Sequence, residues 1–379
     1  MNRSGTLRSS REFFEMKKNG KTLELLKQIE KKGIPLLDCI VYHKGNCVFR
    51  YISGHSDEAG RKPADGTERY NIYSCSKIIT AAAVLQLVEN DTIRLDDPVY
   101  EYLPEFRHMK KSVDEKLEDV KTTMTIRHLF TMTAGLTYNI RSENIRRGIE
   151  ETHGVMQTRE AMKYLACDPL VFEPGSSWKY SLCLDVLAAV AEVASGKRFG
   201  LYVKENVFDR VGMKRSSFLL PDEELHEIAA QYCYDAQNGK YVPCGPGVYE
   251  EKLGSEYESG GSGCISTVED CIAFLEALRC GGTILRRDTI ARMTCPQISR
   301  EAEKACHILV PSNYSYGLGV RCPRPDGAAG DYGWGGSSGA YLAVFPEAEI
   351  SFFYAQHVQG SPAQMMRRDL TETILADIF

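Results

Sequence analysis

The sequence predicts an α+β protein with strands near both ends of the chain and a mostly helical middle. Strand-like runs of apolar or alternating residues lie before residue 54 and after residue 315. Between residues 76 and 255 the apolar residues instead recur mainly at helical spacing. The length of 379 residues favours one large or two interleaved domains. We therefore expect a discontinuous α/β lobe of residues 1–75 and 256–379 and a mostly helical lobe of residues 76–255.

The first part of the chain is predicted to form a helix and then a hairpin. Residues 12–32 carry apolar side chains at helical spacing, and residues 40–53 form two strand-like runs around a Lys-Gly-Asn turn. Residues 55–69 are rich in Gly, Pro, Asp and Ser, which predicts a loop. Helical spacing returns over residues 76–89, so a helix begins at or just before Ser74.

Further helices fill the middle of the chain, and strands return near its end. The helical segments expected are residues 125–131, 142–151, 159–166, 184–195 and 199–211. The late strands expected are residues 316–321, 340–345 and 349–356, followed by a closing helix over residues 362–378. Because strands from both ends belong to the α/β part, that part must be discontinuous in sequence.

Composition and charge exclude several classes of protein. The chain has 46 basic and 51 acidic residues, a net charge of −5, and no basic stripe, so we expect no nucleic-acid partner. It has no apolar run of about 18 residues and no apolar signal-peptide core near its N-terminus, so we expect no membrane partner. The hydrophobic fraction of 43% is ordinary for a globular protein with a sizeable core.

The thirteen cysteines argue against a disulfide framework and against a structural metal. Their number is odd, they never form a C-x-x-C pair, and no Cys/His cluster has zinc-ligand spacing. We therefore expect no metal, thiols that act as small core hydrophobes, and a reducing, cytoplasmic location.

A candidate nucleophile stands at the start of the helix expected over residues 76–89. Ser74-Cys75-Ser76-Lys77 has the pattern S-x-x-K, and positions i and i+3 share one helical face, so the Lys77 amine can reach the Ser74 hydroxyl. A serine hydroxyl becomes nucleophilic when a neighbouring base removes its proton, and a neutral lysine can be that base. Backbone N–H groups at the helix start can stabilise an oxyanion. A helix start with a solvated surface lysine is the alternative.

A second S-x-x-K match shows that the pattern is weak on its own. Ser176-Ser177-Trp178-Lys179 follows Pro174-Gly175 in a loop, with no preceding strand and no helix start. We interpret this second match as chance, because the context around a nucleophile matters more than the four letters.

An ordered series of motifs surrounds Ser74, over roughly residues 35 to 360. The matching segments are residues 73–80, 86–89, 93–99, 102–104, 125–136, 174–187, 193–196, 211–213 and 260–270. Together they resemble the serine β-lactamase/penicillin-binding-protein family, and within it the class C-like branch that includes the family VIII carboxylesterases. The resemblance implies an antiparallel β-sheet flanked by helices, a mostly helical second lobe, and an active site in the cleft between the two.

The same resemblance assigns a role to Tyr180, which follows Pro174-Gly175 and Trp178 in Tyr180-Ser181-Leu182. In the family a tyrosine at this place moves the proton between the nucleophile and the leaving group. The Lys77 ammonium would favour the phenolate form of such a tyrosine. The alternative is a tyrosine that only packs in the core.

Trp334-Gly335-Gly336-Ser337 supplies the third motif, just before a predicted strand. The resemblance implies that this strand edge binds substrate through Trp334, Gly335 and Gly336, and that the N–H groups of Ser74 and Ser337 form the oxyanion hole. Glycines suit an edge where a substrate approaches the backbone closely. A glycine-rich turn between strands is the alternative.

Two other possible nucleophiles lack the context that they need. Gly335-Gly336-Ser337-Ser338-Gly339 matches the G-x-S-x-G elbow, but that elbow needs a preceding strand and a following helix, and here a strand is expected to follow. Its acid and histidine could come only from the last 40 or so residues, such as Glu349 and His357. Cys75 points about 100° away from Ser74 around the helix and has no histidine within the motif to form a thiolate pair.

Two departures from the lactamase pattern bear on the substrate. Leu182 stands where an amide would bind a lactam side chain, and Trp334 and Gly335 stand where a lysine and a threonine would bind the substrate carboxylate. Losing a charge-assisted hydrogen bond of ~1.5–3 kcal/mol predicts turnover of anionic substrates slower by about one to two orders of magnitude. An uncharged ester would not suffer that loss.

The sequence therefore predicts a serine hydrolase that cleaves a small-molecule ester through an acyl-enzyme on Ser74, with Lys77 and Tyr180 as general base and acid. Position alone suggests Tyr138 as a wall of the acyl pocket and Trp334 as a platform for the leaving group. No cofactor is implied, and the sequence does not specify an oligomeric state. The alternatives are a β-lactamase, D-aminopeptidase or amidase of the same family, and a catalytically silent penicillin-binding or scaffold protein.

Overall fold

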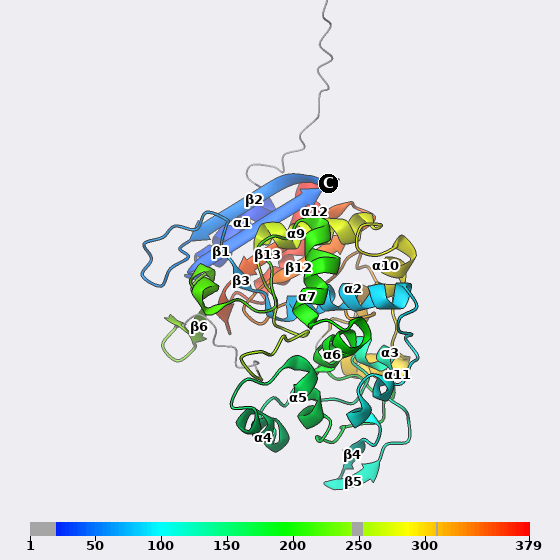
Figure 1. Cartoon of the computed structure of the whole chain (residues 1–379). Coiled ribbons are helices and arrows are strands. Elements are labelled where there is room, and N and C mark those ends of the chain that lie inside the picture. The colour runs from blue at the N-terminus through cyan, green and yellow to red at the C-terminus, as the bar shows by residue number, and fades with distance from the viewer. Residues whose placement is uncertain (1–19, 245–252, 308–309) are drawn as a thin grey trace, which may run out of the picture.

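The structure is a computed structural model that describes residues 20–244, 253–307 and 310–379 (Figure 1). It combines one large antiparallel sheet with many helices (Figure 1). This architecture confirms the predicted α+β class.

The large sheet joins strands from both ends of the chain. Its order is β2-β1-β13-β12-β11-β10-β9, and the pairs along it are antiparallel. The strands are β1 (Leu36–His43), β2 (Asn46–Gly54), β9 (Tyr314–Tyr316), β10 (Arg321–Pro323), β11 (Tyr332–Gly335), β12 (Tyr341–Phe345) and β13 (Ile350–Gln356). Because β1 pairs with β13 along its length, the N-terminal hairpin and the late strands form a single sheet.

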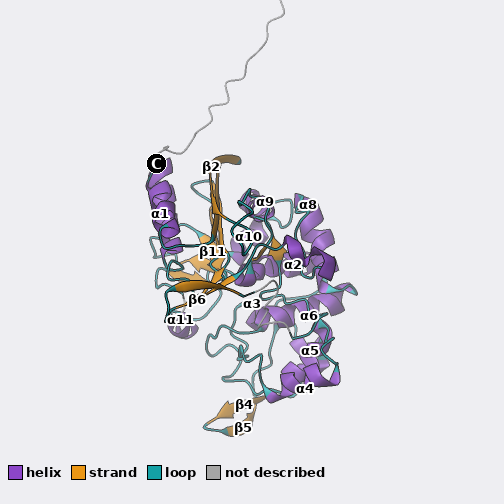
Figure 2. Ribbon diagram, turned by 90° about the vertical axis from the view of Figure 1, so that its left-hand side faces the viewer, coloured by secondary structure: helices purple, strands orange, loops and turns teal. Residues whose placement is uncertain are grey.

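Helices cover both faces of this sheet, as Figure 2 shows with α1 on one side and α9 on the other. On one face α1 (Lys21–Glu30) packs against α12 (Leu370–Ile378). On the other face α9 (Val268–Cys280) packs against β1 and β13. Every residue of β13 is buried, which explains why its sequence is almost continuously apolar instead of alternating.

The remaining helices form a second group beside the sheet (Figure 1). Its centre is α2 (Ser76–Glu89), which is buried from Ser76 to Leu87 and packs against α6 (Cys183–Ser195). A helix that is apolar on all sides must be covered on all sides, so α2 forms the core between the sheet and the outer helices. The others in this group are α3 (Ile126–Phe130), α4 (Glu143–Glu151), α5 (Thr158–Leu165), α7 (Phe199–Val203) and α8 (Asp209–Val211). Two further helices follow α9 in the chain, α10 (Arg287–Met293) and α11 (Arg300–Cys306), and α11 packs against β9.

Most predicted elements are present within a residue or two. The closing helix predicted over residues 362–378 is shorter, because α12 begins at Leu370 after a 3₁₀ turn over Met366–Asp369. Two other differences have physical reasons. The single strand predicted over residues 316–321 was wrong, because Gly317 and Gly319 form a turn that separates β9 from β10. The hairpin of β4 (Lys110–Val113) and β5 (Lys116–Asp119) was not predicted, because most of its residues are polar and none is buried. The part of the predicted first helix before residue 20 lies outside the described residues.

Five short strands form two further small sheets. β3 (Tyr70–Asn71) pairs with β8 (Ile265–Ser266) next to Ser74. A hairpin of β6 (Tyr232–Asp235) and β7 (Lys240–Pro243) carries β14 (Val358–Gln359) along the outer edge of β6.

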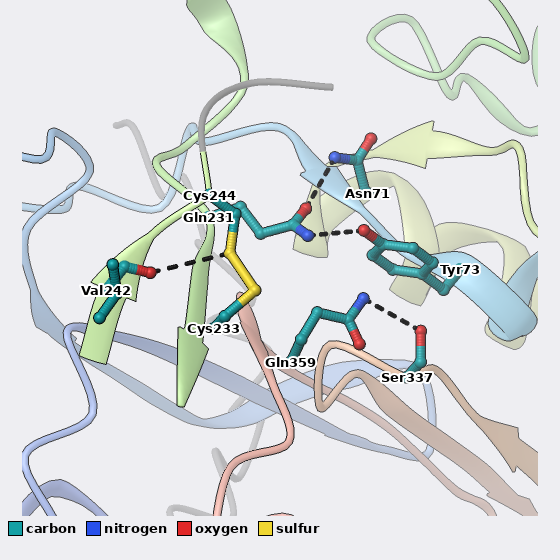
Figure 3. Close-up of a disulfide and its surroundings, with 8 residues drawn as sticks. All are labelled: Asn71, Tyr73, Gln231, Cys233, Val242, Cys244, Ser337 and Gln359. Atoms are coloured by element: carbon teal, nitrogen blue, oxygen red, sulfur yellow. Dashed lines mark hydrogen bonds between the residues drawn. A yellow bond between two sulfur atoms is a disulfide. The ribbon is translucent and has the colours of Figure 1, made fainter. Parts of the chain in front are cut away.

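The cysteines are mostly free and mostly buried, with one exception. Seven free cysteines are buried, as expected of small core hydrophobes, and four are exposed. Cys233 and Cys244 form a disulfide in the β6–β7 hairpin (Figure 3), so the expectation of free thiols was wrong for this pair. Across the described ranges, no helix is long and apolar enough to cross a membrane, and no group of three or more metal-binding side chains occurs.

Candidate active site

Ser74 lies on a sharp turn between β3 and α2. A 3₁₀ turn over Tyr73–Cys75 leads directly into α2 at Ser76, which agrees with the predicted helix start. Tyr73 has a φ of +46°, a left-handed backbone conformation that side chains other than glycine rarely adopt. Such strain next to a reactive residue persists only where surrounding contacts hold it.

Lys77 and Tyr180 both reach the Ser74 hydroxyl. Lys77 Nζ lies 3.2 Å from Ser74 Oγ, and Tyr180 donates its phenolic hydrogen to the same oxygen at 2.5 Å. The lysine side chain is fully buried, and its Nζ lies 4.5 Å from the centre of the Tyr180 ring. The structure thus brings together the three residues that the sequence proposed as catalytic.

The glycine-rich segment before α9 fixes Lys77. Lys77 Nζ donates to the carbonyl of Gly261 at 2.7 Å, and Thr80 Oγ1 donates to the carbonyl of Gly260 at 2.6 Å. A Cβ at Gly260 would lie 2.3 Å from the Leu184 carbonyl oxygen, so only glycine allows this approach. This glycine-rich segment, to which the sequence gave no role beyond its resemblance to a family motif, therefore holds Lys77 in place.

Asp185 is a buried carboxylate near Lys77 to which the sequence assigned no role. Its Oδ1 accepts hydrogen bonds from Tyr257 at 2.8 Å and from Ser259 at 2.6 Å. Burial raises the pKa of Asp185, while the charge of Lys77 and the two hydroxyl donors act in the opposite direction. The sequence placed Asp185 inside a matching motif but gave no sign that its carboxyl group faces the lysine.

The Tyr180 ring stacks against two other aromatic rings. Tyr138 stacks on it with the ring centres 5.5 Å apart and the planes 4° apart, and Trp334 stacks on it at 5.8 Å and 18°. Tyr138 and Trp334 were expected to contact substrate, as a pocket wall and a leaving-group platform. Both rings contact Tyr180 and so help to orient the phenol, and Trp334 also lines the cavity that contains Ser74, where a leaving group could reach it.

Ser337 follows the end of β11, on the opposite side of the site from α2. The ladder between β11 and β12 ends at the pair Gly335 and Tyr341, so the Ser337 amide lies beyond it. A Cβ at Gly336 would lie 2.4 Å from the Ile72 carbonyl oxygen, so the strand end presses against the backbone just before Ser74. Ser74 and Ser337 line the same cavity, as the predicted oxyanion hole requires.

This cavity has a volume of about 230 Å³ and carries positive charge that the sequence did not reveal. Arg321, Arg367 and Arg368 are among its lining residues. A Cβ at Gly335 would lie 2.6 Å from Arg367 Nη2, so the guanidinium fills the space where a side chain would stand. Arg367 Nη1 donates to the carbonyls of Gly336 at 2.8 Å and Ala340 at 3.2 Å, and burial lowers its pKa. No motif contains Arg367; only the folded chain brings it to the strand edge.

The rival nucleophiles do not have the partners they would need. Ser337 Oγ accepts a hydrogen bond from Gln359, while the His357 ring accepts from the Asn71 amide and bonds the Ala229 carbonyl. Strand β12 follows Ser337, so the G-x-S-x-G match is not a nucleophile elbow. The Cys75 thiol is fully buried, and burial raises its pKa to about 12, which opposes thiolate formation. Ser176 and Lys179 are exposed on a loop.

Family comparison agrees with this geometry. The sequence pattern of the Beta-lactamase family matches residues 24–375. The chain belongs to the beta-lactamase family. One curated relative of this beta-lactamase-family protein is the esterase EstB of Burkholderia gladioli, with 33% identity over 63% of this chain and 64% of EstB. The match thus spans somewhat less than two thirds of that esterase.

Other relatives of this beta-lactamase-family protein cover more of the chain. The acyltransferase calJ of Penicillium decumbens is 28% identical over 84% of this chain and 83% of its own length. Among solved structures, the simvastatin synthase LovD of Aspergillus terreus superposes with a TM-score of 0.78 at 23% identity, covering 94% of this chain and 98% of LovD. EstCE1, a hydrolase with promiscuous acyltransferase activity, superposes with a TM-score of 0.74 at 23% identity, covering 92% and 98%. These structures share the fold, and the two curated relatives are named as an esterase and an acyltransferase.

Proposed function

We propose that this protein is a serine hydrolase that cleaves esters through a covalent acyl-enzyme on Ser74. One observation carries the proposal: the Ser74 hydroxyl lies within hydrogen-bond reach of both Lys77 Nζ, at 3.2 Å, and the Tyr180 hydroxyl, at 2.5 Å. A nucleophile touched by two groups that can take and return its proton is the arrangement that acyl transfer needs.

The first half of the reaction forms the acyl-enzyme. Ser74 Oγ attacks the ester carbonyl carbon while its proton passes to Tyr180, and the nearby Lys77 stabilises the phenolate that accepts it. The N–H groups of Ser74 and Ser337 bind the oxyanion. The C–O bond to the alcohol then breaks, and the leaving alkoxide takes the proton from Tyr180.

The second half releases the acid. Water attacks the acyl carbon and gives its proton to Tyr180, the bond to Ser74 Oγ breaks, and the proton returns to Ser74. A fluorophosphonate probe tests the proposal directly. We expect mass spectrometry to find the label on Ser74, with loss of labelling and of ester turnover in Ser74→Ala. The exposed Ser176→Ala should label normally, and labelling elsewhere or not at all would support a catalytically silent protein.

The proposed substrate is a neutral ester, and β-lactam turnover is proposed to be weak. Leu182 is buried and offers no amide to a lactam side chain, and Trp334 stacks on Tyr180 where a lactamase places a lysine. The Arg367 guanidinium at this edge donates Nη1 to two carbonyls. A panel should compare a neutral chromogenic ester, the same ester with a carboxylate, a cephalosporin and a D-aminoacyl amide. Tenfold faster turnover of the cephalosporin or of the anionic ester would show that the argument from Trp334 and Leu182 is wrong.

Acyl transfer to an alcohol is a second candidate function. It is favoured by the relationship to the acyltransferase calJ, which covers 84% of this chain. An alcohol acceptor in place of water would use the same acyl-enzyme. Adding a small alcohol during ester turnover distinguishes the two functions, since a transferase forms the new ester in preference to free acid.

We also propose a cytoplasmic location, because eleven of the thirteen cysteines are free thiols, and the Cys233–Cys244 disulfide, exposed at Cys233, would be open to reduction there. Fractionation of the producing cells tests it.

A further inference from the structure

We propose that the Cys233–Cys244 disulfide stabilises the β6–β7 hairpin and that this hairpin positions the oxyanion hole. Reduction of the disulfide would therefore lower the catalytic rate. The proposal rests on the acyl-enzyme function proposed above. Figure 3 shows two glutamine side chains beside this disulfide, one reaching toward Tyr73 and the other toward Ser337. Tyr73 directly precedes Ser74, whose N–H group is one half of the proposed oxyanion hole, and Ser337 supplies the other half. A glutamine beside the disulfide is therefore hydrogen-bonded either to the residue before Ser74 or to Ser337 itself.

Gln231 forms the first link. It directly precedes β6 and is buried. Its Nε2 donates to the Tyr73 hydroxyl at 2.6 Å, and its Oε1 accepts from Asn71 Nδ2 at 3.1 Å. These two bonds hold the residues on either side of Ile72, namely Asn71 and the left-handed Tyr73, which directly precedes the amide of Ser74. Gln231 therefore acts on the nucleophile turn as a positioning residue.

Gln359 forms the second link. It lies in β14, where it is the register partner of Cys233 in β6. Its Nε2 donates to Ser337 Oγ at 3.2 Å. The strand that carries Cys233 thus holds Gln359 alongside, and Gln359 in turn holds the residue whose amide forms the other half of the oxyanion hole.

The disulfide closes this arrangement covalently. Cys244 follows β7, and its backbone N–H donates to the Gln231 carbonyl at 2.8 Å. The backbone pairing in this small sheet is short: four residue pairs join β6 to β7, and two join β6 to β14. Sheets this small are marginally stable alone, so the covalent link strengthens the position of both glutamines. Cys233 is exposed, and a reductant can reach it.

Reduction follows ordinary thiol–disulfide exchange. One thiolate of a dithiol such as dithiothreitol attacks a protein sulfur, the S–S bond breaks, and a mixed disulfide forms. The second thiol of the reagent then displaces the other protein sulfur. The protein gains two electrons and two protons as two thiols, and the dithiol becomes a cyclic disulfide.

The experiment compares the full-length oxidised protein with the same protein after dithiothreitol and with the double variant Cys233→Ser/Cys244→Ser. Two rates are measured: kcat on a neutral chromogenic ester and the rate of fluorophosphonate labelling of Ser74. We expect both to fall about tenfold with KM nearly unchanged, because oxyanion stabilisation acts in the transition state. Reoxidation should restore both rates, and dithiothreitol should have no further effect on the double variant.

Matched variants separate positioning from general damage. Cys280→Ser removes an exposed free thiol outside the hairpin and should respond to dithiothreitol as the wild type does. Gln359→Leu, at a half-buried site, should lower kcat in the oxidised protein and shrink the effect of reduction.

Three outcomes would overturn the proposal. The first is kcat and labelling that stay within about twofold of the oxidised values after complete reduction. The second is a fall that accompanies loss of a cooperative melting transition, since that is a purely structural effect. The third is a Gln359→Leu variant with unchanged rates. If the oxidised wild type is labelled at Ser74 but hydrolyses no ester, the proposed function fails. The labelling rates then still test whether the disulfide positions the oxyanion hole.

Discussion

At the scale of single residues, the geometry around Ser74 depends on the phenol of Tyr180 and on the glycine at position 336, which has no side chain. The Tyr180 ring stacks against Tyr138 and Trp334, and its hydroxyl donates a hydrogen bond to Ser74 Oγ. Gly336 lets the end of β11 approach the Ile72 carbonyl. Two substitutions separate these contributions.

Tyr180→Phe should lower kcat on a neutral ester by about 10²–10⁴, the usual contribution of a positioned proton-transfer group. The ring remains between Tyr138 and Trp334, so the melting temperature should stay close to that of the wild type. Tyr164→Phe is the matched control, because it removes a hydroxyl that bonds Glu151 away from the site. An unchanged kcat in Tyr180→Phe would mean that Lys77 alone moves the proton.

Gly336→Ala should reduce both acylation and folding stability. The new methyl group would lie 2.4 Å from a backbone oxygen, so either Ser337 or the Ser74 turn must move. Loss of one oxyanion donor costs about 10²–10³ in kcat. Gly330→Ala serves as control, since its methyl group would have only an ordinary contact with Phe345 at 3.9 Å. Stopped-flow acylation rates measure the difference, and full activity in Gly336→Ala would remove Ser337 from the oxyanion hole.

At the scale of elements, short strands and a buried loop connect the nucleophile turn to the rest of the protein. His357 lies between β13 and β14, accepts the Asn71 amide of β3 on Nε2 at 3.2 Å, and bonds the Ala229 carbonyl through Nδ1 at 3.0 Å. Burial lowers the pKa of His357 to about 4, because its protonated form would be desolvated and would lose the bond from Asn71.

This pKa makes the loop sensitive to acid. The folded-state pKa of His357 lies below the unfolded value of about 6.5, so its stabilising effect is complete above that value and is lost as pH falls through about 4. Asp38, buried in β1 with a pKa raised to about 7, has the opposite dependence, so the His357 effect must be isolated. Urea unfolding of wild type and His357→Gln at pH 7 and pH 4.5 does this. We expect the two proteins to converge in stability at the lower pH, and a constant difference would contradict the assignment.

At the scale of the whole molecule, the two ends of the described chain are joined. Asp377 in α12 accepts hydrogen bonds from the backbone N–H groups of Lys21, at 2.9 Å, and Thr22, at 2.8 Å, and so caps the start of α1. The cap carboxylate comes from a residue more than 350 positions away, and it fastens both terminal helices to one face of the sheet.

Asp377→Ala should therefore lower the free energy of unfolding by about 1–2 kcal/mol, the usual value of a helix cap. The substitution lies far from Ser74, so kcat of the folded protein should not change. Glu372→Ala, on the exposed side of the same helix, is the control. A denaturation midpoint equal to that of the control would show that the cap contributes nothing.

The sequence was a good guide wherever local pattern and structure coincide. The helix at Ser74 and the continuous apolar run of β13 both follow from spacing, and Lys77 reaches Ser74 because three residues make almost one helical turn. Motif order also placed Tyr180 correctly beside Ser74.

Other features depend on contacts between distant segments and leave no local signal. Arg367 reaches Gly335 only because the chain turns back across β11 before α12. Cys233 and Cys244 are 11 positions apart in the sequence, a spacing that says nothing about pairing until the hairpin register is known. Tyr138 and Trp334 were placed at the site correctly, but which ring they would face could not be read from position alone.

The stacked rings also give the protein its own optical reporter. The chain contains two tryptophans, and both lie against the same phenol, Trp334 at 5.8 Å and Trp178 at 6.4 Å between ring centres. Intrinsic tryptophan emission therefore arises almost entirely beside Ser74. A change in the charge of Tyr180, or the arrival of an acyl group, should alter that emission, so turnover can be followed in real time on the unlabelled native protein.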